Sequence, residues 1–155
     1  MILDPACGSK MFWFDKDQEG VIFGDIRRES HTLCDGRSLV IKPDIQMSFT
    51  ALPFGDGIFS MVVFDPPHLK NVGKKSWMAL KYGWLAGDWR SALAMGFSEC
   101  LRVLQPGGTL IFKWNEIQIP VSDVLKLAGM RPLFGHKSGK NSKTHWLCFM
   151  KESGR

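Results

Sequence analysis

The stretch VVFDPPHLK, from Val62 to Lys70, gives the first indication of the fold of this chain. Its β-branched and apolar start is typical of a strand buried on both faces of a parallel sheet. Asp65 ends this run, and because prolines fix φ and extend the residue before them, Pro66 and Pro67 hold the strand end rigidly. A carboxylate beside a fixed carbonyl can accept both hydrogen bonds of one amino group. The flat ring of His68 can stack on a planar substrate or take a proton.

Two earlier strands are also predicted to end in an acid. Asp4 closes a short apolar segment and precedes a turn of small residues, Ala6, Cys7 and Gly8, which lets a ligand approach the backbone closely. Asp25 ends the next apolar run, where an acid is well placed to accept hydrogen bonds from ribose hydroxyls. Ligands of parallel sheets bind outside the carboxyl ends of the strands, so these acids predict a site there. The glycine fingerprint of a nicotinamide dehydrogenase is missing.

The remaining elements alternate between strand and helix patterns. Asp88 is a candidate cap for a helix over 89–104, because the apolar residues that follow it recur at helical spacing. The other predicted elements are a helix over 11–17, a hairpin over 32–41, strands at 44–47 and 109–113, a helix over 122–128 capped by Ser122, and a closing antiparallel hairpin of 133–137 with 145–150. This alternation predicts a three-layer α/β domain around a mostly parallel sheet.

Composition fits one globular domain over residues 1–155. The net charge of +5 is compatible with a polyanionic partner but does not require one. The four cysteines are widely spaced and form no metal-binding pair, so we expect no metal site and reduced thiols in a cytoplasmic protein. Neither a membrane span nor a signal peptide is apparent.

Four blocks of the chain, in this order and spacing, resemble class I S-adenosylmethionine-dependent methyltransferases: ILDPACGSK, VIFGDIR, SFTALPFGDGIFSMVVFDPPHL and LQPGGTLIFKW. The resemblance covers nearly the whole chain. The DPPH sequence is similar to the D/N-P-P-Y/F/W motif of amino-group methyltransferases, including those that modify adenine N6 or guanine N2. The resemblance implies a three-layer Rossmann-like methyltransferase fold, mostly parallel, with an antiparallel C-terminal hairpin.

The resemblance also assigns roles to individual residues. Catalytic positions would be Asp65, Pro66, Pro67 and His68, the last of which replaces the family's aromatic residue. Contacts with S-adenosylmethionine would come from Asp4, Ala6, Cys7, Gly8, Lys10, Asp25, Ser48, Phe49 and Asp65. Lys10 stands where the family usually has glycine, and Ser48 where an acid usually contacts the adenine amino group.

The segment from about residue 68 to 90 is predicted to be a substrate loop or lid. It interleaves cations with aromatic rings, as stacked bases and phosphates require, and its candidate substrate-binding residues are Lys74, Lys75, Trp77, Tyr82 and Trp84. The competing interpretation is that the tryptophans pack beneath the loop and the lysines are solvated. A second basic cluster, at 136–145, is either a phosphate clamp or a solvated turn.

The sequence therefore predicts an N-methyltransferase acting on an exocyclic amino group, with a nucleobase of RNA or DNA as the favoured target. A paired base must be flipped out to reach such a site, so the target would be unpaired, or the enzyme would need a partner subunit or a homo-oligomer. One alternative is methyl transfer to a protein amide or a small molecule. Another is a non-catalytic nucleic-acid-binding domain with a degenerate cofactor site.

Overall fold

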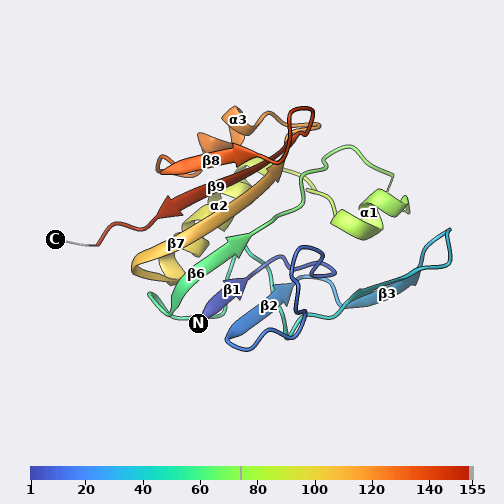
Figure 1. The fold of residues 1–155 in the computed structure, drawn as a ribbon, viewed down its shortest axis with the longest axis horizontal. Helices are drawn as coiled ribbons and strands as arrows, with labels where there is room; N and C mark the ends of the chain where they lie inside the picture. The colour runs from blue at the N-terminus through green and yellow to red at the C-terminus, as the bar shows by residue number, and fades with distance from the viewer. Residues whose placement is uncertain (74, 154–155) are drawn as a thin grey trace.

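A seven-stranded, mostly parallel sheet forms the centre of the molecule (Figure 1). The computed structural model describes residues 1–73 and 75–153. In spatial order the strands of the sheet are β5 (Ile45–Gln46), β2 (Val21–Asp25), β1 (Ile2–Asp4), β6 (Phe59–Phe64), β7 (Leu104–Asn115), β9 (Thr144–Met150) and β8 (Phe134–Lys137). A separate hairpin pairs β3 (Glu29–Thr32) with β4 (Ser38–Ile41). The predicted fold class and both predicted hairpins are confirmed.

The parallel pairing brings the strand ends together. β1 pairs in parallel with both β2 and β6, and β6 pairs in parallel with β7. β9 is antiparallel to β7 and β8 is antiparallel to β9. Because parallel strands all point the same way, Asp4, Asp25 and Asp65 lie at one edge of the sheet, as the sequence predicted.

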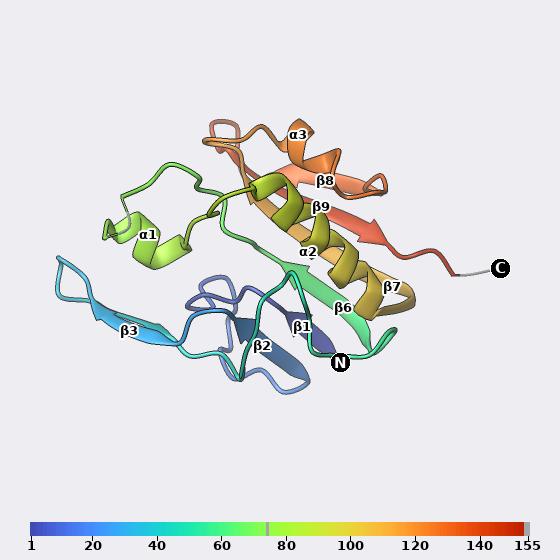
Figure 2. The same cartoon turned by 180° about the vertical axis from the view of Figure 1, so that it is seen from behind.

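One face of the sheet is covered by helices (Figure 2). The long helix α2 (Trp89–Val103) begins at Asp88, whose carboxylate accepts the amides of Arg90 and Ser91 as predicted. Phe97 of α2 packs against Phe64 of β6 and Phe112 of β7, with ring centroids 5.7 and 4.8 Å apart. The short helix α3 (Val121–Leu125) adds Val124 to the same core. Within residues 1–73 and 75–153, no helix has the length and apolar character needed to cross a membrane.

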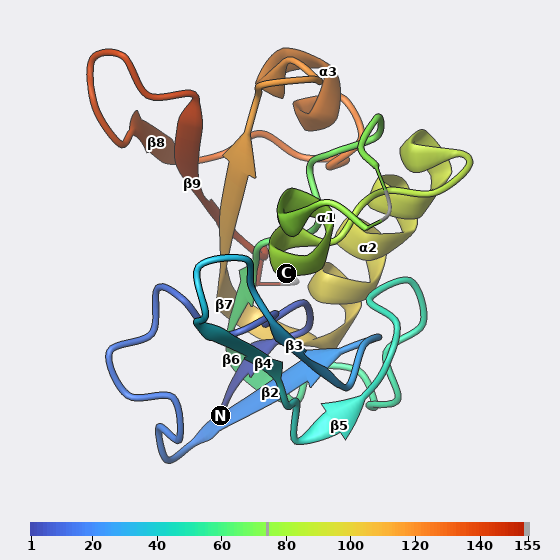
Figure 3. The ribbon, with the colours of Figure 1, turned by 90° about the vertical axis from the view of Figure 1, so that its right-hand side faces the viewer.

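The opposite face is covered in a different way. The helix predicted over 11–17 is wrong: this segment is a loop, and Figure 3 shows the helices gathered on the other side of the sheet. The indole of Trp13 turns inward and donates to the buried Asp4 carboxylate at 2.8 Å. Lys10 adopts a φ of 55° and donates from Nζ to the Lys16 carbonyl at 2.6 Å. In this loop conformation the buried Asp4 carboxylate and the buried Lys10 ammonium both have hydrogen-bond partners.

Two further details differ from prediction. A short helix, α1 (Trp77–Tyr82), forms inside the segment predicted to be a loop, and the Ser76 side chain caps it by accepting the Ala79 amide. Ser122 does not cap α3, because that helix starts one residue earlier and Pro120 occupies the cap position. Proline suits a helix start because its missing N–H would have no partner there.

Candidate functional site

A cavity of about 250 Å³ opens at the carboxyl edge of the sheet. Its walls come from the turn after β1, the end of β2, the DPPH segment after β6 and the end of α1. The residues that line it are Pro5, Ala6, Cys7, Gly8, Ser9, Met11, Phe12, Asp25, Ile26, Arg27, Phe49, Asp65, Pro66, Pro67, His68, Lys81, Tyr82, Gly83, Trp84 and Ala86. Most residues predicted for the site are therefore brought together.

The turn after β1 forms the floor of the cavity. Its Cys7 amide donates to the Gly24 carbonyl at 2.8 Å, which ties the turn to β2. Gly8 has a φ of 51°, a conformation that favours glycine, and a Cβ added there would meet no atom closer than 3.8 Å. The absence of side-chain bulk from Gly8 therefore leaves open space beside the turn for a ligand.

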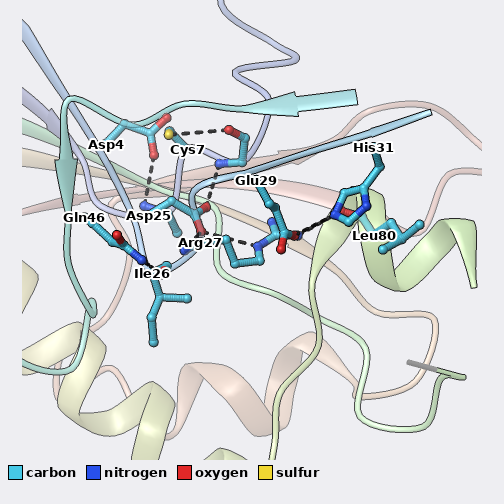
Figure 4. A network of polar contacts seen from close by, with 11 residues as sticks. Asp4, Cys7, Asp25, Ile26, Arg27, Glu29, His31, Gln46 and Leu80 are labelled. Carbon is cyan, nitrogen blue, oxygen red and sulfur yellow. Dashed lines mark hydrogen bonds and ion pairs between the residues drawn. The ribbon is translucent and has the colours of Figure 1, made fainter. Parts of the chain in front are cut away.

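Asp25 is the most highly coordinated carboxylate of the site (Figure 4). Its Oδ2 accepts the Gly8 amide at 2.8 Å, and its Oδ1 accepts the Arg27 amide at 2.8 Å and Arg27 Nε at 3.3 Å. Two backbone amides and a guanidinium fix the orientation of this carboxylate. Oδ2 has capacity for a further hydrogen bond, and the bond from Arg27 Nε to Oδ1 is long at 3.3 Å, so the carboxylate can still accept from ligand hydroxyls.

Arg27 is a site residue that the sequence prediction missed. Besides Asp25, its guanidinium donates from Nη1 to the Leu80 carbonyl at 2.8 Å and lies 3.7 Å from a Glu29 oxygen. Leu80 belongs to α1, so Arg27 links the end of β2 to the segment that covers the cavity (Figure 4). Its place two residues after a strand-end acid was the available signal, because such spacing permits a local ion pair.

Asp65 is paired with a second residue that was missed, Lys113 of β7. Lys113 Nζ lies 2.7 Å from Asp65 Oδ2 and also over the rings of Phe12 and Trp146, at 5.2 and 5.7 Å from their centroids. Burial raises the pKa of Asp65, and the Lys113 charge and hydrogen bond oppose that rise. A single cation inside the apolar strand LIFKW was the signal in the sequence, because such a charge needs a partner.

His68 continues the cavity wall after the prolines. Its ring centroid lies 5.4 Å from that of Tyr82 and 6.3 Å from that of Trp114. Burial, followed by the nearby Lys113 charge, lowers the pKa of His68 to about 4. The imidazole is therefore neutral at pH 7 and a weak base, so of its two predicted roles the geometry favours stacking.

Three residues predicted to contact the cofactor lie outside the lining of this cavity. Asp4 is fully buried behind the turn, where it accepts Trp13 Nε1 and the Ala6 amide, and burial raises its pKa to about 7. The Lys10 ammonium lies 3.9 Å from the centroid of the Phe23 ring. Ser48 shares a 2.7 Å hydrogen bond with Thr50. Phe49, next to Ser48, does line the cavity.

Some of the predicted substrate-binding residues line the cavity and others do not. Tyr82 and Trp84 line the cavity. Trp77 and Lys75 do not, and Trp77 is 50% exposed. Lys81, which was not among the predicted substrate residues, lines the cavity, and its ammonium lies 5.4 Å from the ring centroid of Trp77 and 5.1 Å from that of Tyr82. Lys74 lies outside the described residues.

The donor set fits an adenosine-type cofactor better than a metal. Asp25 presents carboxylate oxygens, Phe49 presents an apolar ring, and the Ala6–Gly8 turn leaves open space. Among the described residues, no group of three or more His, Cys, Asp or Glu side chains is arranged to hold a metal ion.

No protein-family model matches the sequence, and no curated protein matches it either. Solved structures do match the fold. A protein from Pyrococcus horikoshii is 17% identical with a TM-score of 0.60, over 97% of this chain and 81% of that one. A TehB-like SAM-dependent methyltransferase from Corynebacterium glutamicum is 16% identical with a TM-score of 0.54, over 97% of this chain and 79% of that one.

A third structure is the T. thermophilus 16S rRNA N2 G1207 methyltransferase in complex with AdoMet and guanosine. It is 16% identical with a TM-score of 0.53, over 99% of this chain but only 36% of the other. At such identities the likeness establishes the fold, which is the Rossmann-like fold of class I methyltransferases.

Proposed function

We propose that this chain is an S-adenosylmethionine-dependent N-methyltransferase that acts on an exocyclic amino group, best matched by a nucleobase. The observation that carries the proposal is the cavity at the sheet edge, in which the Asp65-Pro66-Pro67-His68 segment stands opposite Asp25 and the small-residue turn. The methyltransferase structures that share the fold support the choice of cofactor.

The cofactor would lie between the first two strand ends. Asp25 would accept hydrogen bonds from the ribose hydroxyls, because its carboxylate is already fixed by Gly8 and Arg27. Phe49 would pack against the adenine ring, and the Ala6–Gly8 turn would follow the methionine part. When bound, this cofactor supplies a methyl group on a positively charged sulfur.

The target amine would be held by the DPPH segment. Lys113 occupies Oδ2 of Asp65, so Oδ1 and the Pro66 carbonyl would accept the two N–H groups of the amine. This arrangement would direct the nitrogen lone pair toward the methyl group; the N–C bond would form as the S–C bond of the cofactor breaks, and the proton lost from the nitrogen would pass to its hydrogen-bond acceptor, Asp65 Oδ1, or to water. Catalysis would rest on proximity and orientation, since the prolines hold both acceptors in place.

A planar, anionic substrate would fit the aromatic rings and the cation around the cavity. His68, Tyr82 and Trp84 give the cavity flat walls, and Lys81 stands beside the rings of Tyr82 and Trp77. Aromatic faces next to cations bind stacked bases and phosphates. In this proposal residues 1–155 act as one catalytic domain, the 68–90 segment is its lid, and an unpaired base of RNA or DNA enters beneath α1.

The test has two stages. Calorimetric titration of the wild-type chain with S-adenosylmethionine and its demethylated product should show binding of both. Radiolabelled methyl transfer to RNA, DNA, protein and small-molecule fractions should then label nucleic acid. Asp65→Ala should bind the cofactor but transfer at least about a hundredfold more slowly, because orientation of the amine is lost. Asp123 of α3 is half-buried, pairs with Lys126 and lies outside the cavity, so Asp123→Ala serves as a matched control that should keep activity.

Three outcomes would contradict the proposal. Full activity of Asp65→Ala would remove its mechanism. Label in protein or small molecules alone would replace the nucleobase with those acceptors. Salt-dependent binding of nucleic acid without any binding of cofactor would indicate a non-catalytic domain.

A further inference from the structure

The face of the sheet opposite α2 and α3 carries an apolar hollow. Strand residues alternate between the two faces, so Val62 and Phe64 point to the helices while Val63 points the other way. The hollow measures about 360 Å³ and is lined by Phe12, Trp13, Phe14, Asp15, Gln18, Val63, Ile111 and Trp146. We refer to this side of the sheet, including the hollow and its rim, as the open face.

Large apolar side chains stand exposed around the hollow. Phe14 at its rim is 109% exposed, so none of the described residues covers its ring. Met150 follows Cys148 by two residues along β9, and the register pairs Phe134 of β8 with Cys148. Both residues therefore lie on the open face, where they are 46% and 69% exposed. An apolar patch of this kind, next to a hollow, marks an interaction surface.

Opposite charges flank the two ends of this face. The loop between β1 and β2 descends toward the amino ends of the strands, while the turn between β8 and β9 lies at their carboxyl ends; Figure 3 shows both on the side away from the helices. The acidic loop is exposed and comprises Asp15, Asp17 and Glu19, with Lys16 as its one exposed cation. The basic turn is also exposed and comprises Lys137, Lys140 and Lys143, of which Lys137 pairs with Glu116 at 3.2 Å.

We propose that the open face binds a second copy of this chain in a two-fold symmetric dimer. A two-fold axis that lies in the plane of the interface and crosses the strands reverses the strand direction. When this axis is perpendicular to the line that joins the acidic loop to the basic turn, it places the acidic loop of each copy against the basic turn of the other. The same operation brings Phe14 of each copy toward the hollow of its partner, so one surface supplies both knob and hole. The acidic loop repels phosphates, which disfavours nucleic acid as the occupant of this face.

The dimer would also support the catalytic cavity. Phe12 lines both the hollow and the cavity, and Lys113 lies over its ring while pairing with Asp65. A second copy that covers the open face would therefore hold Phe12, and with it one wall of the catalytic cavity, in place. The proposal itself holds whether or not the chain transfers methyl groups, because it rests on shape and charge outside the cavity.

Sedimentation velocity of the purified chain over a wide concentration range tests the proposal. We expect a concentration-dependent dimer that weakens as salt rises, and at least about tenfold weaker association for Phe14→Ser, because a central aromatic anchor is lost. Since Phe14 is fully exposed, this change leaves the fold intact, which circular dichroism checks. Met95→Ser removes an exposed apolar side chain from α2 and should associate like the wild type.

A charge-reversal pair makes the test sharper. Asp15→Lys/Asp17→Lys and Lys140→Glu/Lys143→Glu should each weaken self-association, and mixing the two should restore a dimer in which both loop–turn contacts join opposite charges. A wild-type chain that stays monomeric at every concentration would overturn the proposal. So would a dimer that Phe14→Ser and both charge reversals leave unchanged. Binding of nucleic acid to a monomer that Phe14→Ser abolishes would assign the face to that ligand instead.

Discussion

Asp4 and Asp25 are the same residue type at the ends of neighbouring parallel strands, yet they occupy different environments. Asp25 faces the cavity, where backbone amides and Arg27 fix its orientation. Asp4 is buried against the Trp13 indole, and burial raises its pKa to about 7. A position at a strand end therefore places an acid at the carboxyl end of the sheet. The partners of its side chain then determine whether the carboxylate is available to a ligand or is buried in the fold.

Asp65 is an intermediate case. Like Asp25 it lines the cavity, but its partner is the Lys113 side chain rather than backbone amides. Its burial and its ion pair act on its pKa in opposite directions. These three acids can be separated by experiment, because each responds to a different substitution and a different measurement.

The largest difference should appear in cofactor affinity. Asp25→Ala removes the acceptors proposed for the ribose hydroxyls, and two hydrogen bonds to a charged group are worth about 4 kcal/mol together, so calorimetry should show binding weakened roughly a thousandfold. Asp4→Asn, behind the turn, should bind within about fivefold of the wild type, a change of about 1 kcal/mol. Equal losses in both variants would contradict the division of roles.

The second difference concerns stability against pH. Between about pH 4 and 7, folded Asp4 keeps a proton that the unfolded chain releases, so its contribution to stability is lost as pH rises. Urea unfolding should therefore show that the free energy of unfolding of Asp4→Asn rises relative to that of the wild type by roughly 3 kcal/mol across this range. Each unit of pKa difference between the folded and unfolded chain is worth about 1.4 kcal/mol, and partial opening of the folded chain makes the effect smaller than the whole pKa difference would give.

His68 has the opposite pH dependence, because its pKa is lowered by burial to about 4 and its contribution is lost as pH falls from about 6.5. This term is common to both proteins, so the difference between wild type and Asp4→Asn isolates the carboxyl group. A difference that does not change with pH would show that Asp4 is ionised in the folded chain.

The smallest effect is expected at Lys113. Lys113→Met leaves the burial of Asp65 unopposed, so the pKa of Asp65 should rise and methyl transfer should fall severalfold at mildly acid pH while recovering at higher pH. Lys113→Arg keeps the charge and should keep the profile. Carbon-13 NMR of the Asp65 carboxyl would measure the rise in its pKa without an activity assay. An Asp65 titration that is unchanged in Lys113→Met would contradict the ion pair between Lys113 and Asp65. The activity part rests on the proposed function.

Most of the sheet could be predicted from the sequence because its signals are local. The apolar run before Asp65, the Asp88 cap and the Asp-Gly turn each specify their own few residues of backbone. The 11–17 segment shows where local pattern fails. It contains no glycine or proline to break a helix, but Trp13 instead donates to a buried carboxylate that precedes it by nine residues.

The order of elements along the chain, the acids at the strand ends and the rigid DPPH segment can all be predicted from the sequence, because each depends on neighbours along the chain. Three features follow from the folded arrangement alone: which acid faces the cavity, the bond from Arg27 to the Leu80 carbonyl, and the pairing of Lys113 with Asp65. Those pairs join residues 53 and 48 positions apart. Their energies depend on burial and distance, and both arise only when the strands have assembled into a sheet.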